Sequence, residues 1–252
     1  MDIVFIGAGN VAFHLSKSLH DAGFTIVQIF SRTEASAKKL ANVLNTAYTN
    51  KIDNITDNAS VYIMSVSDNA IEGISERLTM LNGLVVHTAG GVSIDVFKEK
   101  IKNYGVLYPL QTFSKSRPVS FSEIPLFIEA NSRENLQIIS KIAGAISQKV
   151  HFASSEERRQ LHLAAVFACN FVNHLYNISA QLARQARFDF TILEPLILET
   201  AHKALASENP ADVQTGPAVR NDSEVMKKHK DLLSSLPEWK KIYEILSENI
   251  MR

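Results

Sequence analysis

The sequence shows no excess of charge of either sign. Lysine and arginine number 26 and aspartate and glutamate also number 26, so the formal net charge of the 252 residues is zero. A nucleic-acid-binding protein normally carries a basic excess or a basic face. Neither is visible in this sequence, and we therefore expect no nucleic-acid partner.

Cysteine and long hydrophobic runs are scarce. Cys169 is the single cysteine, which excludes a disulfide framework and a cysteine-based metal site and is typical of a reducing compartment. The longest apolar stretch, Leu161–Leu182, is interrupted by histidine, asparagine and glutamine, so it does not resemble a membrane span. The first predicted strand begins so early that we expect no signal peptide. These features predict a cytoplasmic protein with no membrane contact.

The chain also lacks repeats and low-complexity linkers, but its two parts have different patterns. Up to about Val150, short β-rich runs alternate with helical stretches. Candidate strands are Ile3–Gly7, Thr25–Ser31, Ser60–Ser65, Leu84–Thr88, Gly105–Tyr108 and Leu126–Glu129. Candidate helices lie at about Val11–Ala22, Glu34–Leu44, Asn69–Leu81, Ser93–Lys100 and Arg133–Ile146. This alternation predicts the α/β class, with a doubly wound, mainly parallel sheet of the Rossmann type.

After Ser154 the pattern becomes helical throughout. The expected helices are Glu156–Arg187, Phe190–Ser207, Asp222–Ser234 and Pro237–Met251, the last with a proline suited to a first helical turn. The change of pattern predicts two closely packed domains, residues 1–153 and residues 154–252.

A glycine motif follows the first predicted strand. Gly7-Ala8-Gly9-Asn10-Val11-Ala12 has the form Gly-x-Gly-x-x-Ala and opens a helix, which is the context that a dinucleotide-binding turn requires. Gly7 would make the tight turn and Gly9 would let a pyrophosphate approach the backbone, while the helix N-terminus supplies free N–H groups. The plainer alternative is an ordinary tight turn between a strand and a helix.

The second predicted strand ends in Ser31-Arg32-Thr33. A fold selective for NAD usually places an acidic residue there to bind the ribose 2′-hydroxyl. Here Arg32 offers a forked cation that suits a 2′-phosphate, while Glu34 is a weaker candidate for a ribose contact. The sequence therefore favours NADP, although Arg32 could also be a surface arginine.

Two later strands end in small or polar residues at the edge where open α/β sheets bind ligands. One is followed by Ser65-Val66-Ser67-Asp68 and the other by Thr88 after His87. Asp68 could contact a ligand or cap its helix, and His87 could be functional or simply a buried histidine.

The first helix after Ser154 carries uncharged polar residues on one arc of about 120° on a helical wheel. These residues are His162, Asn170, Asn173, His174, Asn177 and Gln181. Since no lysine, arginine or acidic residue lies between Leu161 and Ala183, the arc is not a typical solvated face. It could line the cofactor cleft, form a polar network in the helical core, or lie in a subunit interface. The broad apolar remainder of the helix predicts a homodimer through the helices.

A further motif is Gly216-Pro217-Ala218-Val219-Arg220-Asn221-Asp222. Arg220 could bind a substrate carboxylate or a cofactor phosphate, or it could form a surface ion pair. Asp222 is a plausible N-cap of the next helix.

Over nearly its whole length the chain resembles bacterial Rossmann-like proteins that carry the C-terminal domain of unknown function 2520. The motifs that carry the resemblance are the glycine turn, Ser65–Asp68, His87–Gly90, Tyr108-Pro109-Leu110-Gln111-Thr112-Phe113, Leu163–Ala168 and Gly216–Asp222. That family is similar in architecture to pyrroline-5-carboxylate reductase, coenzyme F420-dependent NADP oxidoreductase and the β-hydroxyacid dehydrogenases. The resemblance implies a dinucleotide domain, a helical dimerising domain and redox chemistry. The β-hydroxyacid dehydrogenases place a lysine, with an asparagine one turn later, on this first helix, whereas here Val166 follows His162 by one turn.

These observations predict an NADP-dependent oxidoreductase that acts on a carbonyl or imine group of a small metabolite. A protein that binds NADP as a sensor, without catalysis, is the alternative. The predicted catalytic residues are His162 as proton donor, Asn170 to orient the substrate, and Arg220 or Gln111 to anchor it. The predicted cofactor-binding residues are Gly7, Ala8, Gly9, Asn10, Val11, Ser31, Arg32, Thr33, Ser65, Val66, Ser67 and Thr88.

Overall fold

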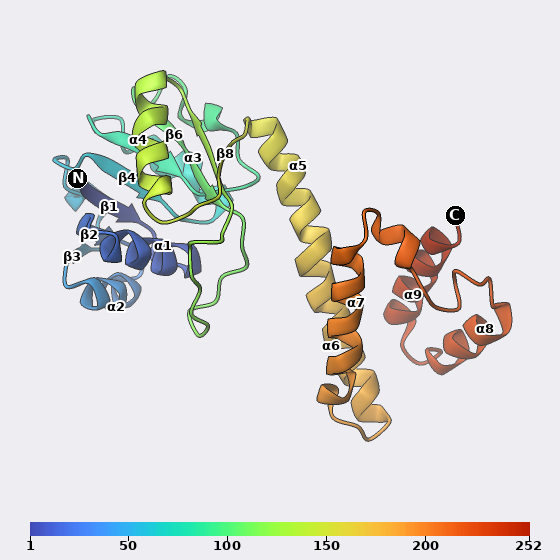
Figure 1. Cartoon of the computed structure of the whole chain (residues 1–252). Coiled ribbons are helices and arrows are strands. Elements are labelled where there is room, and N and C mark those ends of the chain that lie inside the picture. Colours follow the sequence, from blue (N-terminus) through green and yellow to red (C-terminus); the bar gives the residue numbers. More distant parts are fainter. The chain divides into compact units, whose positions relative to one another are not determined.

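The structure is a computed structural model that describes residues 1–252, and it contains one eight-stranded sheet. The strands are β1 (Asp2–Ile6), β2 (Thr25–Phe30), β3 (Ala47–Thr49), β4 (Val61–Met64), β5 (Leu84–His87), β6 (Tyr104–Pro109), β7 (Leu126–Ala130) and β8 (Val150–Phe152). Their spatial order is β3-β2-β1-β4-β5-β6-β7-β8. Figure 1 shows the sheet among its helices, with β3, β2 and β1 following one another at one edge. All neighbours are parallel except β6 and β7. The predicted Rossmann-type, mainly parallel sheet is therefore confirmed, because its first six strands follow the dinucleotide-binding order.

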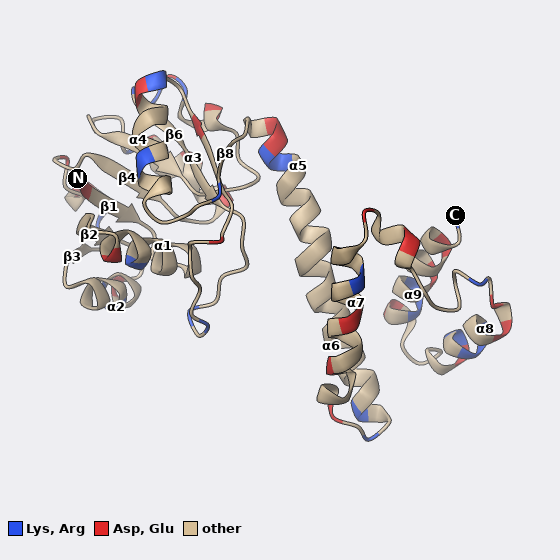
Figure 2. Ribbon diagram, in the orientation of Figure 1, with Lys and Arg blue, Asp and Glu red and all other residues tan.

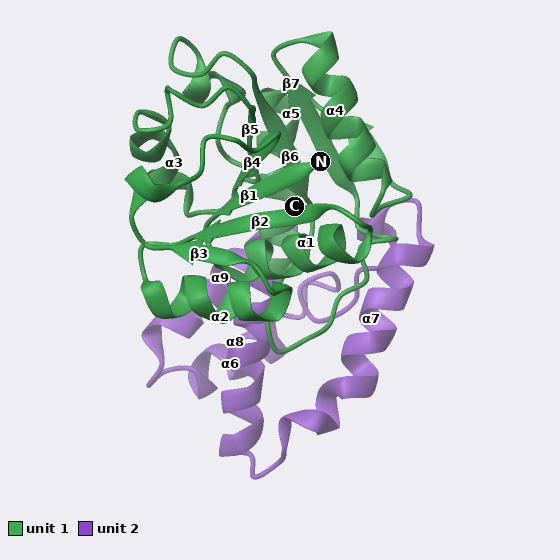
Figure 3. Ribbon diagram, turned by 90° about the vertical axis from the view of Figure 1, so that its left-hand side faces the viewer, with its two compact units in different colours: residues 1–170 green, residues 171–252 purple.

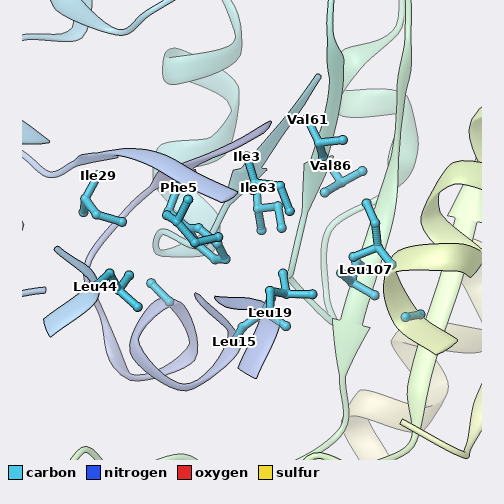
Figure 4. Close-up of a cluster of buried hydrophobic side chains, with 14 of the residues drawn as sticks. Ile3, Phe5, Leu15, Leu19, Ile29, Leu44, Val61, Ile63, Val86 and Leu107 are labelled. Carbon is cyan, nitrogen blue, oxygen red and sulfur yellow. The ribbon is translucent and has the colours of Figure 1, made fainter. Parts of the chain in front are cut away.

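The strands are apolar on both faces, and each face has its own core. Along β1, Ile3 and Phe5 join one cluster of buried side chains, whereas Val4 and Ile6 join the other. Figure 4 shows the first cluster, in which Leu15 and Leu19 pack beside Phe5. Such continuous apolar strands require helices on both sides of the sheet.

Four α-helices pack in the sheet-containing part. They are α1 (Asn10–Asp21), α2 (Glu34–Leu44), α3 (Asp68–Ser75) and α4 (Arg133–Gly144). The first core contains residues of α1, α2 and α4, and the second contains Ile71 of α3 and Phe97. The arrangement is thus a doubly wound α/β sandwich.

Two of the predicted helices are shorter than the sequence pattern indicates. The α3 helix ends at Ser75, whose hydroxyl donates to the Glu72 carbonyl at 2.6 Å, a local bond that competes with helix continuation. The predicted helix Ser93–Lys100 is only the short 3₁₀ helix η2 (Ile94–Phe97), because Glu99 adopts a left-handed φ of 64°. A second 3₁₀ turn, η1 (Ile52–Asn54), lies between β3 and β4.

The long helix predicted at Glu156–Arg187 is interrupted. Helix α5 (Ser155–Ala165) leads into a π-helical segment, η3 (Val166–Phe171), and then into α6 (Val172–Gln185). A π-helical turn contains more residues than an α-helical turn, so the angular register of a regular helical wheel is lost across η3. Figure 2 shows charged residues at the start of α5 and an uncharged stretch through α6 as far as Arg184.

The remaining residues are helical. They form η4 (Phe190–Leu193), α7 (Glu194–Ala206), η5 (Pro210–Val213), α8 (Ser223–Leu232) and α9 (Pro237–Ile250). The side chain of Asp222 accepts a hydrogen bond from the Val225 N–H at 3.1 Å, so the predicted N-cap is confirmed.

Two compact units make up the chain, residues 1–170 and residues 171–252 (Figure 3). The last strand ends at Phe152, but α5 belongs to the first unit. The division into domains at residue 153, which follows the change of secondary structure, stays a prediction. No helix has the combination of length and apolar character that a membrane crossing needs.

Candidate functional site

A cavity of about 510 Å³ lies in the first unit at the carboxyl ends of β1, β4, β5 and β6. Its position matches the point at which strand order reverses between β1 and β4, where open α/β sheets bind their ligands. The volume lies within the range of small-molecule and cofactor sites. Its lining includes eleven of the twelve predicted cofactor-binding residues: Gly7, Ala8, Gly9, Asn10, Val11, Ser31, Arg32, Ser65, Val66, Ser67 and Thr88.

The glycine turn fits a nucleotide phosphate for reasons that the surrounding protein makes explicit. Gly7 has a φ of +117°, and a Cβ there would overlap the Ser65 carbonyl oxygen, so glycine is required by the fold. Gly9 is different, because its φ is −76° and a Cβ would meet no protein atom within 4 Å. A small residue at position 9 therefore keeps the cavity open beside the N-terminus of α1, where backbone N–H groups favour an anion.

The end of the cavity next to β2 carries an arginine side chain that no other group of the chain binds. Arg32 is exposed, lines the cavity, and forms no salt bridge or hydrogen bond within the chain. Thr33 is the N-cap residue of α2, and Glu34 is the first residue of that helix. Neither Thr33 nor Glu34 lines the cavity. The site thus presents a guanidinium, and no carboxylate, at the position that discriminates a 2′-phosphate from a 2′-hydroxyl.

The floor of the cavity joins the ends of β4 and β5. The hydroxyl of Thr88 donates to the Ser65 hydroxyl oxygen at 3.2 Å, and both residues are buried. Asp68 lines the cavity beside them and makes no side-chain cap, since Ser67 is the N-cap residue of α3. The ligand-facing interpretation of Asp68 therefore fits better than the capping one.

A tyrosine and a histidine meet at the far end of the same cavity. The Tyr108 hydroxyl oxygen lies 3.0 Å from Nδ1 of His162, and both side chains line the cavity. Tyr108 comes from the end of β6 and His162 from α5. A Cβ on Gly90 would lie 2.7 Å from His162 Nδ1 and from Tyr108 Cζ, so a glycine is needed where these two side chains meet. Burial, with the nearby Asp68 carboxylate, raises the pKa of Tyr108 to about 12, although Arg158 opposes the shift.

A buried ion pair fixes α5 against the sheet. The Arg158 side chain is fully buried, and its guanidinium donates to the Glu129 carboxylate at 2.5 Å and to the carbonyl oxygens of Ala89 and Val92. Ser155 donates from its hydroxyl to the same carboxylate at 2.8 Å. Arg158 lies one helical turn before His162, so this network sets the position of the histidine relative to the loop after β5.

His87 does not belong to the cavity. It is fully buried, and its Nδ1 accepts a hydrogen bond from the Ala89 N–H at 3.2 Å. Burial, with a contribution from the Arg158 charge, lowers the pKa of His87 to about 3. The interpretation as a neutral, buried histidine that shapes the turn after β5 is the one supported.

The loop between β6 and β7 is fastened to the phosphate-binding turn. Asn10 donates to the Phe113 carbonyl at 2.9 Å, His14 Nε2 lies 2.9 Å from the Ser114 carbonyl, and Lys115 donates to the Ala8 carbonyl at 2.8 Å. The side chain of Asn10 is thus engaged with protein, and its role toward a cofactor falls to its backbone N–H.

Of the four predicted catalytic residues, the structure brings His162 and Gln111 to the cavity. Asn170 is exposed within η3 and does not line it. Asn170 follows His162 by eight residues, which corresponds to about 12 Å along a helix axis, so the two residues lie about two turns apart. Arg220 is an exposed residue of the second unit, and its role toward the substrate stays a prediction.

Sequence reasoning missed the two residues that organise this end of the site. Tyr108 entered only as part of a family motif, although the carboxyl end of a strand in an open α/β sheet is where ligands bind. Arg158 was not singled out within the helix predicted at Glu156–Arg187. No local pattern distinguishes it from the neighbouring exposed Arg159, because its burial depends on pairing with Glu129, 29 residues earlier.

Two family models match the chain. The model described as domain of unknown function 2520 covers residues 124–250, and the one described as NADP oxidoreductase, coenzyme F420-dependent, covers residues 2–89. Among curated proteins, none matches the sequence.

Solved structures give the same picture. A Bacteroides fragilis protein named as a candidate NADP oxidoreductase is 43% identical, with a TM-score of 0.95 over 99% of this chain and 97% of its own. A pyrroline-5-carboxylate reductase of Streptococcus pyogenes is 13% identical, with a TM-score of 0.65 over 100% and 98%. An imine reductase of Myxococcus stipitatus, in complex with NADP⁺, is 14% identical, with a TM-score of 0.63 over 100% and 92%. The last two share the fold, and the chain belongs to the family that carries domain of unknown function 2520.

Proposed function

We propose that this member of the family is an NADP-dependent oxidoreductase that reduces a carbonyl or imine group of a small metabolite. One observation carries the proposal: a single cavity at the sheet's switch point contains the glycine turn, the unpaired Arg32 and the protic His162. The match to the F420-dependent NADP oxidoreductase model and the name of the Bacteroides fragilis relative support the choice of cofactor.

The residues present fit a dinucleotide phosphate. The open space at Gly9 and the N-terminus of α1 would hold the pyrophosphate, and Arg32 with Ser31 would hold the 2′-phosphate of the adenosine half. Ser65, Val66, Ser67 and Thr88 line the continuation of the cavity toward His162 and would flank the nicotinamide half. Bound NADPH supplies a hydride there.

The chain's own contribution to reduction is a proton and a binding surface. His162 is the cavity's candidate proton donor, since a hydrogen-bonded imidazole at the end of the site is suited to general acid catalysis. Gln111 is exposed at the cavity wall and offers its side-chain N–H₂ to a carbonyl or carboxylate oxygen. Because Gln111 lines the same cavity as His162, we assign substrate anchoring to Gln111.

We further propose that the protein is a homodimer through its helices. Large apolar side chains are exposed on the helices after β8, among them Leu163 (58% exposed), Ile192 (58%) and Leu196 (64%). Asn173, His174 and Asn177 are also exposed, which argues against a polar network in the core of one chain and favours a subunit interface. A second copy with the same surfaces would cover both sets of residues.

Leu196→Glu, which places a charge on that surface, is expected to convert a dimer to a monomer. Sedimentation velocity would measure the change, with Lys203→Glu, at an exposed position of the same helix that is already charged, as the control. A wild-type protein that sediments as a monomer at micromolar concentration would contradict the proposed dimer.

We also propose a cytoplasmic location. Cys169 is an exposed, free thiol, which suits a reducing compartment. Export of the protein to an oxidising compartment would test the suitability of this thiol for a reducing one. Cys169 is expected to form intermolecular disulfides there, which a non-reducing gel detects.

The proposed activity is tested by the oxidation of NADPH, followed by its absorbance, with a panel of cyclic imines, 2-oxo acids and aldehydes. We expect at least one class to give substrate-dependent turnover, and His162→Gln to reduce the rate on the order of 100-fold while NADPH still binds. His151→Gln, an exposed histidine outside the cavity, is the matched control. NADPH binding without turnover of any member would contradict the proposed activity.

A further inference from the structure

We propose that Tyr108 positions and resupplies the proton that His162 delivers, so that the two residues act as one proton-delivery couple. The proposal rests on the reductase function proposed above. Its structural basis is the 3.0 Å contact between the Tyr108 hydroxyl and His162 Nδ1 at the end of the cavity.

The contact fixes which imidazole nitrogen carries the proton. Tyr108 is 8% exposed, and its hydroxyl has His162 as its single hydrogen-bond partner in the chain. A buried hydroxyl donates to an available ring nitrogen, because otherwise its proton would be left without an acceptor. Nδ1 of His162 is then the acceptor, and the neutral imidazole holds its proton on Nε2. No other side chain in the structure hydrogen-bonds to His162, so Nε2–H remains available as a donor.

The surroundings keep Tyr108 in its protonated form. Burial and the Asp68 carboxylate, across the cavity on α3, both disfavour a phenolate, and together they raise the pKa of Tyr108 to about 12. The Arg158 guanidinium on α5 limits the rise. Tyr108 therefore holds a proton throughout the physiological range, yet it remains a much stronger acid than an alcohol.

The proton transfer balances in atoms and charge. As the carbonyl or imine carbon is reduced, its oxygen or nitrogen gains an electron pair and forms a bond to the proton from His162 Nε2. The Nε2–H bond breaks, the O–H bond of Tyr108 breaks, and a new N–H bond forms at Nδ1. The imidazole is neutral before and after the transfer. Tyr108 is left as a phenolate. When the product leaves, Nε2 of His162 takes up a proton from water and the Nδ1 proton returns to the Tyr108 oxygen, which restores the starting state.

The scaffold holds the couple from two sides. Tyr108 pairs with Phe127 across β6 and β7, while His162 follows Arg158 by one turn of α5 and so depends on the buried Arg158–Glu129 pair. Gly90 provides the space in which the two rings meet edge to face, with centroids 6.0 Å apart. Positioning by rigid elements is what a proton-transfer pair requires.

Tyr108→Phe removes one oxygen and keeps the ring, and it is the decisive variant. Tyr104→Phe is the matched control, because Tyr104 lies on the same strand, does not line the cavity and makes no side-chain hydrogen bond. The full-length protein would be compared as wild type, Tyr108→Phe, His162→Gln, the double variant and Tyr104→Phe. NADPH affinity would be measured by fluorescence, turnover with the panel above, and the His162 tautomer by ¹⁵N NMR at about pH 9, where imidazole is neutral.

We expect the wild type and Tyr104→Phe to show His162 as the Nε2–H tautomer, and Tyr108→Phe to show a mixture of the two tautomers. Tyr108→Phe should lower kcat on the order of 10-fold with NADPH affinity and KM unchanged. The double variant should be no slower than His162→Gln, because residues that act as a unit lose their effect together.

A wild-type His162 in the Nδ1–H tautomer, or a Tyr108→Phe variant with unchanged kcat in an active enzyme, would overturn the couple while leaving the reductase function intact. Losses that multiply in the double variant would also overturn it. A wild-type protein that binds NADPH and reduces no member of the panel would overturn the reductase function and the proton delivery with it.

Discussion

The two compact units of the chain differ in how they bury apolar surface. In residues 1–170 many core side chains, such as Phe5 and Ile63, are completely inaccessible to solvent. In residues 171–252 the most buried apolar side chains retain 7–9% exposure: Ile178, Ala218, Met226 and Leu233. The first unit therefore has its own close-packed core and contains every residue that lines the cavity. The second has exposed apolar faces that are suited to association with a second copy.

The largest predicted effect is the loss of unfolding free energy when a core side chain is truncated in the first unit rather than in the second. Phe5→Ala should cost about 3–5 kcal/mol of unfolding free energy, because it leaves a cavity in a packed core. Met226→Ala should cost less than about half as much, since its site is more exposed and can relax. Urea denaturation would measure both, with the fluorescence of the single tryptophan, Trp239 in α9, reporting the second unit and hydrogen exchange reporting the first.

Equal costs for Phe5→Ala and Met226→Ala would contradict the stated difference between the units.

The next largest loss of unfolding free energy is expected when the buried Arg158–Glu129 ion pair of the first unit is broken. Glu129→Gln should cost about 3 kcal/mol, because it leaves the fully buried Arg158 guanidinium without a counter-charge. Glu123→Gln is a suitable control, since its partner Lys149 is half-exposed and such surface pairs contribute little. Thermal or urea unfolding would compare the two, and hydrogen exchange should show faster opening of α5 only in Glu129→Gln.

Acid sensitivity should also be concentrated in the first unit. The pKa of His87 is about 3 in the folded protein against 6.5 in an unfolded chain, so the unfolded state binds the proton more readily. The stabilisation associated with neutral His87 is complete above about pH 6.5 and is lost as the pH falls toward 3. At pH 5 the loss is about 2 kcal/mol. His87→Asn, which keeps an acceptor near the Ala89 N–H, should flatten the dependence of stability on pH in this range.

A His87→Asn variant that loses stability on acidification as steeply as the wild type would rule out this origin.

The smallest change in stability, and the clearest separation of fold from ligand, is expected at Gly9. Gly9→Ala should change the unfolding free energy by no more than about 0.5 kcal/mol, because its Cβ would meet no protein atom. It should weaken NADPH binding by at least about tenfold, since the methyl group would occupy the phosphate position. Gly7→Ala, by contrast, should cost stability directly through its positive φ and the overlap with Ser65. Calorimetric unfolding and fluorescence titration would separate the two.

Local patterns predicted the part of the fold that depends on local chemistry. The strand periodicity, the glycine turn and the helix at Glu34–Leu44, which has the same bounds in the structure, all follow from neighbouring residues. The three-residue strands β3 and β8 were missed because they are too short to show a period. The π-helical segment was missed because nothing in Val166–Phe171 distinguishes it from a regular helix.

The candidate site divides in the same way. Motifs at strand ends identify Gly9, Arg32 and Ser65, and the structure brings these residues to one cavity, while their role in cofactor binding stays a prediction. The catalytic half of the site depends on tertiary contacts. The pairing of Tyr108 with His162 joins residues 54 positions apart, and the absence of Asn170 from the cavity lining depends on where α5 lies against the sheet. Neither arrangement can be predicted from a short stretch of sequence, because both depend on tertiary structure.

The central claim, that this cavity is an NADP site, is tested most directly by titrating the wild type and Arg32→Ala with NADPH and NADH and following cofactor fluorescence. We predict that the wild type binds NADPH more tightly than NADH. Arg32→Ala should weaken NADPH binding by about 1–3 kcal/mol and leave NADH binding nearly unchanged, because the lost contact is a charge-assisted bond to the 2′-phosphate. Failure of the wild type to bind either nucleotide, or an equal loss for both in Arg32→Ala, would contradict the account.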